Sequence, residues 1–281
     1  QREPRGFGIY EKTLPTGMTW EDTFATAASA GYDFFELSID ATLERQDRLH
    51  WSDKQRQRVW RSASEHNIDI RVLTLSAHRE TPWGSAEAGQ RARAGFLAKA
   101  TIDLAADLEA ECVQIAGYFA FNAPRAPKAR ELFLDGLVSA AEYAAHQGVV
   151  LAIENVDGVD VTSIGDGLGL IDDAKATNIY LYIDVGNLTG NELDVVSELK
   201  SGLPSAYCVQ LKDARPGVFR RVPFGAGDVP FGDVFDELVK APPVYVSVEM
   251  WNDENNPFLP MEAGEWARSQ WRAAVNRYQQ H

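Results

Sequence analysis

The chain has 281 residues, of which 45% are hydrophobic and 24% are charged. This length fits either two small domains or one α/β barrel, and the apolar share is sufficient for a large core. The net charge of -14 argues against nucleic acid or an anionic membrane as a partner. An anionic substrate would therefore need a local basic cluster.

Two cysteines are present, and each lies inside an apolar run. Cys112 and Cys208 are predicted to be buried thiols in a reducing compartment, and neither a disulfide nor a metal site. No apolar run approaches the ~20 residues that span a membrane. The opening stretch QREPRGFGIY lacks the apolar region of a signal peptide. These features predict a cytoplasmic protein.

Short apolar runs alternate with amphipathic, Ala-rich segments from end to end. The runs have the length and composition of buried strands. We expect strands at residues 7–10, 34–37, 70–75, 112–115, 149–153, 180–183, 207–211 and 244–248. The intervening segments predict helices at about 19–30, 52–66, 85–108, 127–147, 164–176, 193–200, 231–240 and 261–278.

The order of these segments predicts the fold. Thr19 has the position of a helix N-cap, and Gly31 and Gly148 have the position of C-terminal stops. Strands that alternate with helices pair in parallel, and eight such units imply a closed (β/α)8 TIM barrel. A doubly wound open sheet is the alternative, but no GxGxxG loop follows the first strand. Without a linker or a low-complexity tract, residues 1–281 are predicted to form a single domain.

Carboxylates follow three of the predicted strands. Glu154 ends the fifth strand, Asp184 the sixth and Glu249 the eighth, while Gln210 lies in the seventh. In a barrel the carboxyl ends of the strands meet at the active site, so these side chains should converge. Each alone could be a helix N-cap or a solvated loop end, but converging carboxylates are unfavourable without a cation. Oxygen donors without thiolates favour Mn²⁺, Mg²⁺ or Co²⁺, with Zn²⁺ as the alternative.

This arrangement predicts a reaction. A cation bound to a ketose carbonyl and the adjacent hydroxyl makes the intervening C–H group acidic and stabilises an enediolate. Glu154 and Glu249, three strands apart, could lie on opposite faces of the substrate and exchange its proton. Such an exchange inverts the carbon.

The stretch 207–227 carries a basic loop. Lys212, Arg215, Arg220 and Arg221 stand against Asp213, a local charge of +3 in a strongly acidic chain. This cluster favours the capture of an anion such as a phosphate. The alternative is a solvated loop whose arginines pair with carboxylates, and Lys212 could pair with a carboxylate inside the site.

Three more residues at strand ends are candidates for substrate or phosphate binding. His78 follows the third strand, and a hydrogen-bonded structural histidine is the competing interpretation. Glu11 follows the first strand and Tyr118 the fourth.

With these residues placed, the chain resembles the L-ribulose-5-phosphate / L-xylulose-5-phosphate 3-epimerase group of the xylose-isomerase-like barrels. The resemblance covers nearly the whole chain, and its motifs fall in the group's order. They are GIYEKTLP (8–15), LSAHRETPWGS (75–85), QIAGY (114–118), AIENVD (152–157), IDVGNL (183–188), KDARPGVFRRVPFGAG (212–227) and VEMW (248–251).

The resemblance implies a metal site and a phosphorylated substrate. Glu154, Asp184, the position in strand seven and Glu249 would hold the metal, and the two glutamates would be the acid/base pair. The group has His-x-Lys-Asp in strand seven, where this chain has Gln210-Leu211-Lys212-Asp213. A carboxamide oxygen is a neutral and weaker donor than imidazole. We therefore expect metal binding that is retained but weaker.

The leading prediction is a metal-dependent ketopentose-5-phosphate 3-epimerase that acts on a small sugar phosphate. An aldose–ketose isomerase or a free-ketose 3-epimerase on the same barrel is the nearest alternative. A sugar-phosphate binding protein that has lost catalysis through Gln210 is another, although two intact glutamates argue against it. A metal-dependent phosphodiesterase would usually be richer in histidine. The apolar face of residues 266–278 is expected to pack on the barrel, and packing on a second subunit in a homodimer is the alternative.

Overall fold

The computed structural model describes residues 3–280. Eight parallel strands form a closed barrel in the order β1-β10-β7-β6-β5-β4-β3-β2. Each predicted strand is present, and the predicted (β/α)8 barrel is confirmed. The strands are β1 (Gly6–Tyr10), β2 (Phe34–Ile39), β3 (Asp69–Leu75), β4 (Cys112–Ala116), β5 (Val150–Glu154), β6 (Ile179–Asp184), β7 (Ala206–Leu211) and β10 (Tyr245–Val248).

Helices follow the strands, as the alternation predicts. They are α1 (Trp20–Ser29), α2 (Leu43–Gln46), α3 (Asp53–Glu65), α4 (Ala88–Asp107), α5 (Ala129–Gln147), α6 (Ile164–Ala174), α7 (Val185–Gly190), α8 (Val195–Gly202), α9 (Phe231–Lys240) and α10 (Leu259–Gln279). Short 3-10 turns are η1 (Glu11–Thr13), η2 (Asp47–His50), η3 (Ser76–Arg79) and η4 (Leu203–Ser205).

The helix ends follow from local chemistry. The Thr19 side chain accepts the Asp22 N–H group and caps α1, as predicted. Gly31 and Gly148 have φ angles of 79° and 72°, the left-handed conformation that stops a helix at low steric cost. The helix predicted from Ser85 begins three residues later, because Ser85 is buried and forms an isolated bridge with Arg125.

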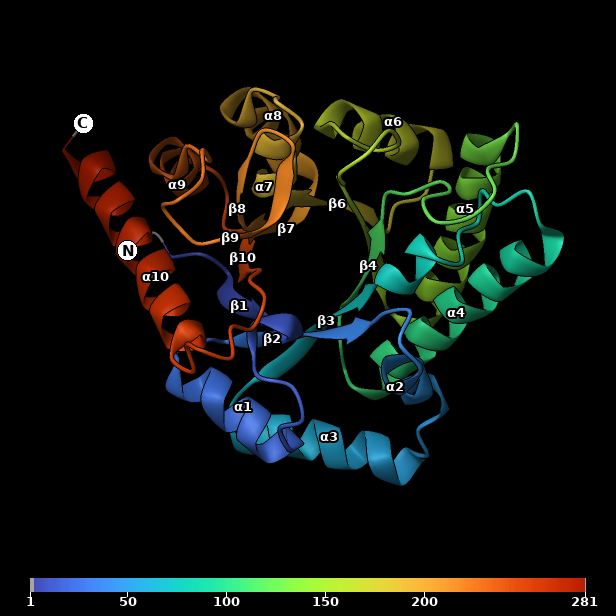
Figure 1. The fold of residues 1–281 in the computed structure, drawn as a ribbon, viewed down its shortest axis with the longest axis horizontal. Coiled ribbons are helices and arrows are strands. Elements are labelled where there is room, and N and C mark those ends of the chain that lie inside the picture. Colours follow the sequence, from blue (N-terminus) through green and yellow to red (C-terminus); the bar gives the residue numbers. More distant parts are fainter. Residues whose placement is uncertain (1–2, 281) are drawn as a thin grey trace. The chain divides into compact units, whose positions relative to one another are not determined.

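The chain divides into two compact units that interleave along the sequence. The first unit comprises the stretch up to Glu36, Ser62–Asp69 and the part from Tyr182 on. The second comprises Leu37–Arg61 and Ile70–Leu181. In the first unit α9 and α10 lie side by side, and in the second α4 and α5 do (Figure 1). The expectation of a single domain stays a prediction.

Aromatic contacts in the first unit cover part of the apolar face of the last helix. Trp271 makes edge contacts with Phe7 and Phe235, and Trp266 stacks on Phe224. Tyr278 is 41% exposed. Trp266 and Trp271 thus pack within their own unit. A homodimer stays a prediction.

An antiparallel hairpin follows β7 where the sequence suggested only a loop. Strands β8 (Asp213–Arg215) and β9 (Val218–Val222) pair across the Pro216-Gly217 turn, beside α7 (Figure 1). Gly217 has a φ of 70°, which its position in a tight turn requires. The hairpin was not predicted because two arginines interrupt the apolar pattern of β9.

The described residues contain no helix that combines the length and apolar character needed to cross a membrane. Cys112 and Cys208 are free and fully buried, as predicted.

Candidate active site

Polar side chains of β7 and β10 share one face of the sheet. The parallel register pairs Gln210 with Ser247. Because side chains alternate between the two faces of a strand, Lys212 and Glu249 follow two residues later on the same side. The Glu249 N–H group donates to the Leu211 carbonyl oxygen at 2.9 Å, which extends the ladder to the glutamate. This alternation gathers the polar groups at the carboxyl ends of the two strands.

The Lys212 ammonium group lies close to the carboxylates of Asp184 and Glu249 in the first unit. Its Nζ is 2.5 Å from Asp184 Oδ2 and 3.4 Å from Glu249 Oε2. It also donates to Asn187 Oδ1 at 2.8 Å and lies 6.0 Å from the centroid of the Trp251 ring. Lys212 is 3% exposed. Of the two sequence interpretations, this geometry favours the lysine that pairs with carboxylates inside the site.

Asp184 is both the last residue of β6 and the N-cap of α7. Its Oδ1 accepts the Asn187 N–H group at 2.9 Å, and its Oδ2 faces Lys212. Burial raises the pKa of Asp184 to about 6, and the Lys212 ammonium opposes this rise. The two effects oppose each other, because burial favours the neutral carboxyl group and the ammonium favours the charged one. Asn187 is a contact residue that the sequence analysis did not single out, although its spacing from Asp184 is that of a capped N3 position.

Gln210 lies two residues before Lys212 on the same face of β7. It is 2% exposed, and its Oε1 has no hydrogen-bond partner within residues 3–280. A buried carbonyl oxygen without a partner is unfavourable unless a donor or a cation satisfies it. Together with Asp184 and Glu249 it forms a set of oxygen donors, so the first unit fits a hard divalent cation.

Glu36, which the sequence analysis did not single out, lies inside the first unit on β2. It is fully buried, and its carboxylate accepts a hydrogen bond from the Tyr182 hydroxyl. Burial raises the pKa of Glu36 to about 7. The signal was present in the sequence, because a glutamate interrupts the otherwise apolar run at 34–37.

The second unit holds Glu154 and a separate polar cluster. Glu154 ends β5 and is half-buried. The Tyr118 hydroxyl donates to Asp157, and the Arg79 guanidinium lies over the rings of Tyr118 and Phe121 at 5.2 and 4.6 Å. Burial raises the pKa of Tyr118 well above its usual value, so the phenol stays protonated. Arg79 and Asp157 were not predicted as partners of Tyr118.

His78 has the environment of a structural histidine. It is 1% exposed, its Nε2 lies 3.1 Å from the Ala94 carbonyl oxygen, and its ring meets Trp83 edge-on. Burial lowers the pKa of His78 to about 4, which keeps the imidazole neutral at physiological pH. Its Nδ1 has no hydrogen-bond partner in the described part of the chain.

Arg220 and Arg221 lie on β9, with Arg220 half-buried and Arg221 exposed. The hairpin that carries them is held by Asp213, which is 1% exposed. Its Oδ2 accepts the N–H groups of Gly225 and Gly227 at 2.8 and 2.9 Å. The glycine-rich exit thus binds a carboxylate of its own chain, and any phosphate bound here would depend on the arginine side chains.

Glu11 begins η1 directly after β1 and is half-buried. The turn is joined to the segment after β10. Thr13 Oγ1 accepts the Met250 N–H group at 3.1 Å and lies 3.2 Å from the Met250 carbonyl oxygen. The Asn252 N–H group donates to the Lys12 carbonyl oxygen at 2.7 Å. These bonds join the turn that begins with Glu11 to the loop that follows Glu249.

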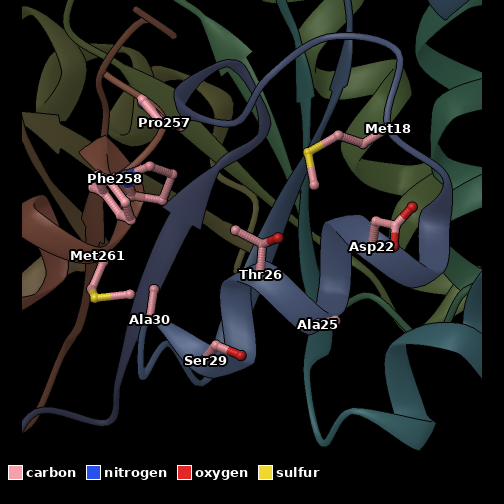
Figure 2. A pocket seen from close by; sticks show the side chains of 10 residues that line it. Met18, Asp22, Ala25, Thr26, Ser29, Ala30, Pro257, Phe258 and Met261 are labelled. Carbon is pink, nitrogen blue, oxygen red and sulfur yellow. The ribbon is translucent and has the colours of Figure 1, made fainter. Parts of the chain in front are cut away.

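A separate pocket of about 500 Å³ lies against α1 and the start of α10 (Figure 2). Its lining residues include neither the acidic residues described above nor any residue predicted for the site, so the pocket is distinct from the acidic centre. The lining residues are Met18, Asp22, Ala25, Thr26, Ser29, Ala30, Pro257, Phe258, Pro260 and Met261.

Two bacterial relatives are similar in sequence over most of the chain. L-ribulose-5-phosphate 3-epimerase UlaE of Escherichia coli O157:H7 (strain EC4115 / EHEC) is 35% identical over 267 residues, covering 93% of each chain. The protein of the same name from Shigella flexneri gives the same identity and coverage.

Solved structures agree in fold. D-psicose 3-epimerase in the presence of D-fructose matches with a TM-score of 0.80 and 16% identity, covering 96% of this chain and 99% of that chain. L-ribulose 3-epimerase matches with a TM-score of 0.77 and 19% identity, covering 98% and 97%. The model of the family described as xylose isomerase-like TIM barrel matches residues 24–270. The chain belongs to the xylose isomerase-like TIM barrel family and is an enzyme of the isomerase class.

Proposed function

We propose that this enzyme is a metal-dependent ketopentose-5-phosphate 3-epimerase that interconverts L-ribulose 5-phosphate and L-xylulose 5-phosphate. The observation that carries the proposal is the buried centre of the first unit, where Asp184 and Glu249 face one ammonium group near the unpartnered amide oxygen of Gln210. The names of the 35% identical relatives support the choice of substrate.

We assign the cation to the carboxylates of Glu154, Asp184 and Glu249, a group that could hold a metal ion, with the Gln210 amide oxygen as a fourth donor. An all-oxygen set favours Mn²⁺, Mg²⁺ or Co²⁺ over Zn²⁺. A bound divalent cation would supply positive charge for the negative oxygens that form when the substrate loses its proton.

Glu154 and Glu249 would exchange the proton at C3 from opposite faces of the substrate. One carboxylate removes the proton from C3, and the other, in its protonated form, returns a proton to the opposite face. Asp184 would stay ionised throughout, because the bound cation and the Asn187 N–H group would stabilise its charge. Burial of these groups keeps bulk water from competing for the intermediate.

Arg220 and Arg221 would bind the substrate phosphate, since their hairpin follows β7 directly. Lys212 is a weaker phosphate candidate, because its ammonium already faces two carboxylates. Glu11, Tyr118 and His78 remain candidates for contacts with the sugar.

The test follows hydrogen exchange at the substrate carbons. Metal-stripped protein is incubated in D₂O with L-ribulose 5-phosphate, with and without Mn²⁺ or Mg²⁺, and the quenched, chelated sugar is examined by NMR. Metal-dependent deuterium at C3 with formation of L-xylulose 5-phosphate is the expected result. Exchange at C1 with an aldose product would identify an aldose–ketose isomerase, and bound substrate without exchange under any metal would identify a binding protein.

Two glutamate variants test the proton exchange. Glu154→Gln and Glu249→Gln should each lower the rate of exchange by about 100- to 10,000-fold, the usual contribution of a general acid or base. Glu254→Gln is a matched control, because Glu254 is exposed and lies in the loop after Glu249. Equal rates in all three variants would contradict the assignment.

A comparison of substrates tests the phosphate site. Arg220→Met and Arg221→Met should raise KM for L-ribulose 5-phosphate and leave that for free L-ribulose unchanged, because only the phosphate needs the positive charge. Arg272→Met, an exposed change of the same charge on α10, is the control. A preference of the wild type for the free ketose would move the assignment to a free-ketose 3-epimerase. We place the activity in the cytoplasm, in line with two buried free thiols.

A further inference from the structure

Lys212 has a built binding site for its ammonium group inside the first unit. Three oxygens surround its Nζ: Asp184 Oδ2 at 2.5 Å, Asn187 Oδ1 at 2.8 Å and Glu249 Oε2 at 3.4 Å. The Trp251 ring lies beyond them at 6.0 Å. Two carboxylates and one amide oxygen in this arrangement suit a cation, and the Lys212 ammonium group is that cation.

The backbone makes room for this side chain at Gly186. A Cβ atom at this position would lie 2.9 Å from Lys212 Cε and 2.6 Å from the Lys212 carbonyl oxygen. Any larger residue would therefore clash with the lysine and with its backbone. The inward path of the Lys212 side chain is thus set by the first turn of α7, which also carries Asn187.

Both oxygens of Asp184 are already engaged. Oδ1 accepts the Asn187 N–H group at 2.9 Å, and Oδ2 holds the Lys212 ammonium. A divalent cation that binds Asp184 must therefore take Oδ2 from Lys212 or share it at short range with a second positive charge. Like charges at such a distance in a buried place repel strongly.

We propose that Lys212 is an internal competitor of the divalent cation: its ammonium holds Asp184 and Glu249 together in the metal-free protein and leaves Asp184 Oδ2 when the metal binds. The displaced ammonium stays near Asn187 Oδ1 and the Trp251 ring, which are already in its reach. Lys212 is thus a positioning residue that sets metal affinity. The inference rests on the metal site of the proposed function, and it concerns affinity and not the reaction.

Titration of metal-free protein with Mn²⁺ or Mg²⁺ in a calorimeter tests this inference. Lys212→Met should bind the metal about 10- to 100-fold more tightly than the wild type, the range by which residues next to metal ligands alter affinity. The melting temperature of the metal-free variant should fall, and metal should restore it by a larger shift than in the wild type. Lys200→Met, which removes an exposed lysine near Glu237, is the control for the loss of one charge.

Unchanged or weaker metal affinity in Lys212→Met would overturn the inference, and so would a failure of both proteins to bind metal. If the variant does not fold, the wild type can be tested by NMR with ¹⁵N-labelled lysine. The Lys212 ammonium signal should be protected from solvent exchange without metal, and saturating Mg²⁺ should shift it and reduce its protection. An unchanged signal with bound Mg²⁺ would contradict the proposal.

The two proposals can fail separately. Tighter metal binding by Lys212→Met together with no C3 exchange in the wild type would support the competition and contradict the epimerase. Metal-dependent C3 exchange in the wild type with equal metal affinity in both proteins would do the reverse.

Discussion

Glu36 is a carboxyl group enclosed in the first unit without contact with solvent. Its neighbour Tyr182 is fully buried too, and burial raises the pKa of both groups. The tyrosine stays protonated and donates to the glutamate. The nearby charges of Glu249 and Asp184 raise the pKa of Glu36 further, and Asp184 lies two residues after Tyr182 on the same side of β6.

The pKa of Glu36, about 7 in the folded protein against 4.5 for the free side chain, predicts a pH effect on stability. Between these values the unfolded chain releases the proton while the folded chain retains it, so the free energy of unfolding falls as pH rises. Glu36→Gln removes this effect and keeps an acceptor for Tyr182. The stability of metal-free wild type relative to the variant should fall by roughly 3 kcal/mol from about pH 4.5 to 7.

Chemical denaturation of both proteins at several pH values measures this difference. The difference should level off above pH 7, where both states are ionised, and below pH 4.5, where both are protonated. A constant difference across the window would show that Glu36 ionises normally in the folded protein.

Carboxylates at strand ends could be predicted from their position, whereas a polar residue inside a strand needed another signal. Asp184 and Glu249 end or follow apolar runs, and the family resemblance pointed to Gln210 inside β7; the structure places all three in one unit. Asn187 belongs to this centre through its bond to Lys212, which depends on how a side chain bends in space and not on sequence spacing. Glu36 interrupts an apolar run, and this signal was not used in the prediction.

At the scale of elements, the β8–β9 hairpin owes its shape to one carboxylate. Asp213 accepts N–H groups of Ala214, Gly225 and Gly227, so it joins the start of β8 to the glycine-rich exit. A Cβ atom at Gly227 would lie 2.1 Å from Asp213 Oδ1. The glycine is thus required by the close approach of backbone and carboxylate.

Asp213→Asn should loosen this hairpin, because an amide has one acceptor oxygen and would turn an NH₂ group toward backbone donors. The free energy of unfolding should fall by roughly 2–3 kcal/mol, as for lost hydrogen bonds to a charged group. Amide hydrogen exchange at Gly225 and Gly227 should accelerate. Asp228→Asn, in the same loop but exposed, is the matched control. Unaltered exchange at both glycines would show that Asp213 does not hold the loop.

Helices and strands were predictable where periodicity and caps agree. The Thr19 cap and the stops at Gly31 and Gly148 are local signals, and the structure confirms them. The hairpin was missed because its pairing depends on a turn and on a buried carboxylate, and neither produces an apolar pattern. The start of α4 was predicted too early because Ser85, a plausible cap by type, is used by a contact with Arg125.

At the scale of the whole molecule, the barrel topology followed from counting alternating segments, while the division into two interleaved units did not. The boundaries of the units fall inside β2, α3, β3 and β6, at Glu36–Leu37, Arg61–Ser62, Asp69–Ile70 and Leu181–Tyr182. No linker marks these points, because each boundary lies within one continuous strand or helix.

The two cysteines give a prediction for the folded chain as a whole. Cys112 and Cys208 are fully buried and free, so a thiol reagent such as Ellman's reagent should react slowly with the native protein. The denatured protein should release two equivalents of the chromophore without prior reduction. Fewer than two equivalents would indicate a disulfide, and rapid labelling of the native protein would indicate an exposed thiol.

The pairing of β1 with β10 also has a consequence for biosynthesis. Gly6 pairs with Tyr245, so the first strand emerges from the ribosome long before its partner exists. At ~5–20 residues per second this delay is roughly 10–50 s. During that time Phe7 and Ile9, both buried in the finished protein, lack their partners Val246 and Val248. Closure of the barrel at β1 must therefore wait until β10 has been synthesised.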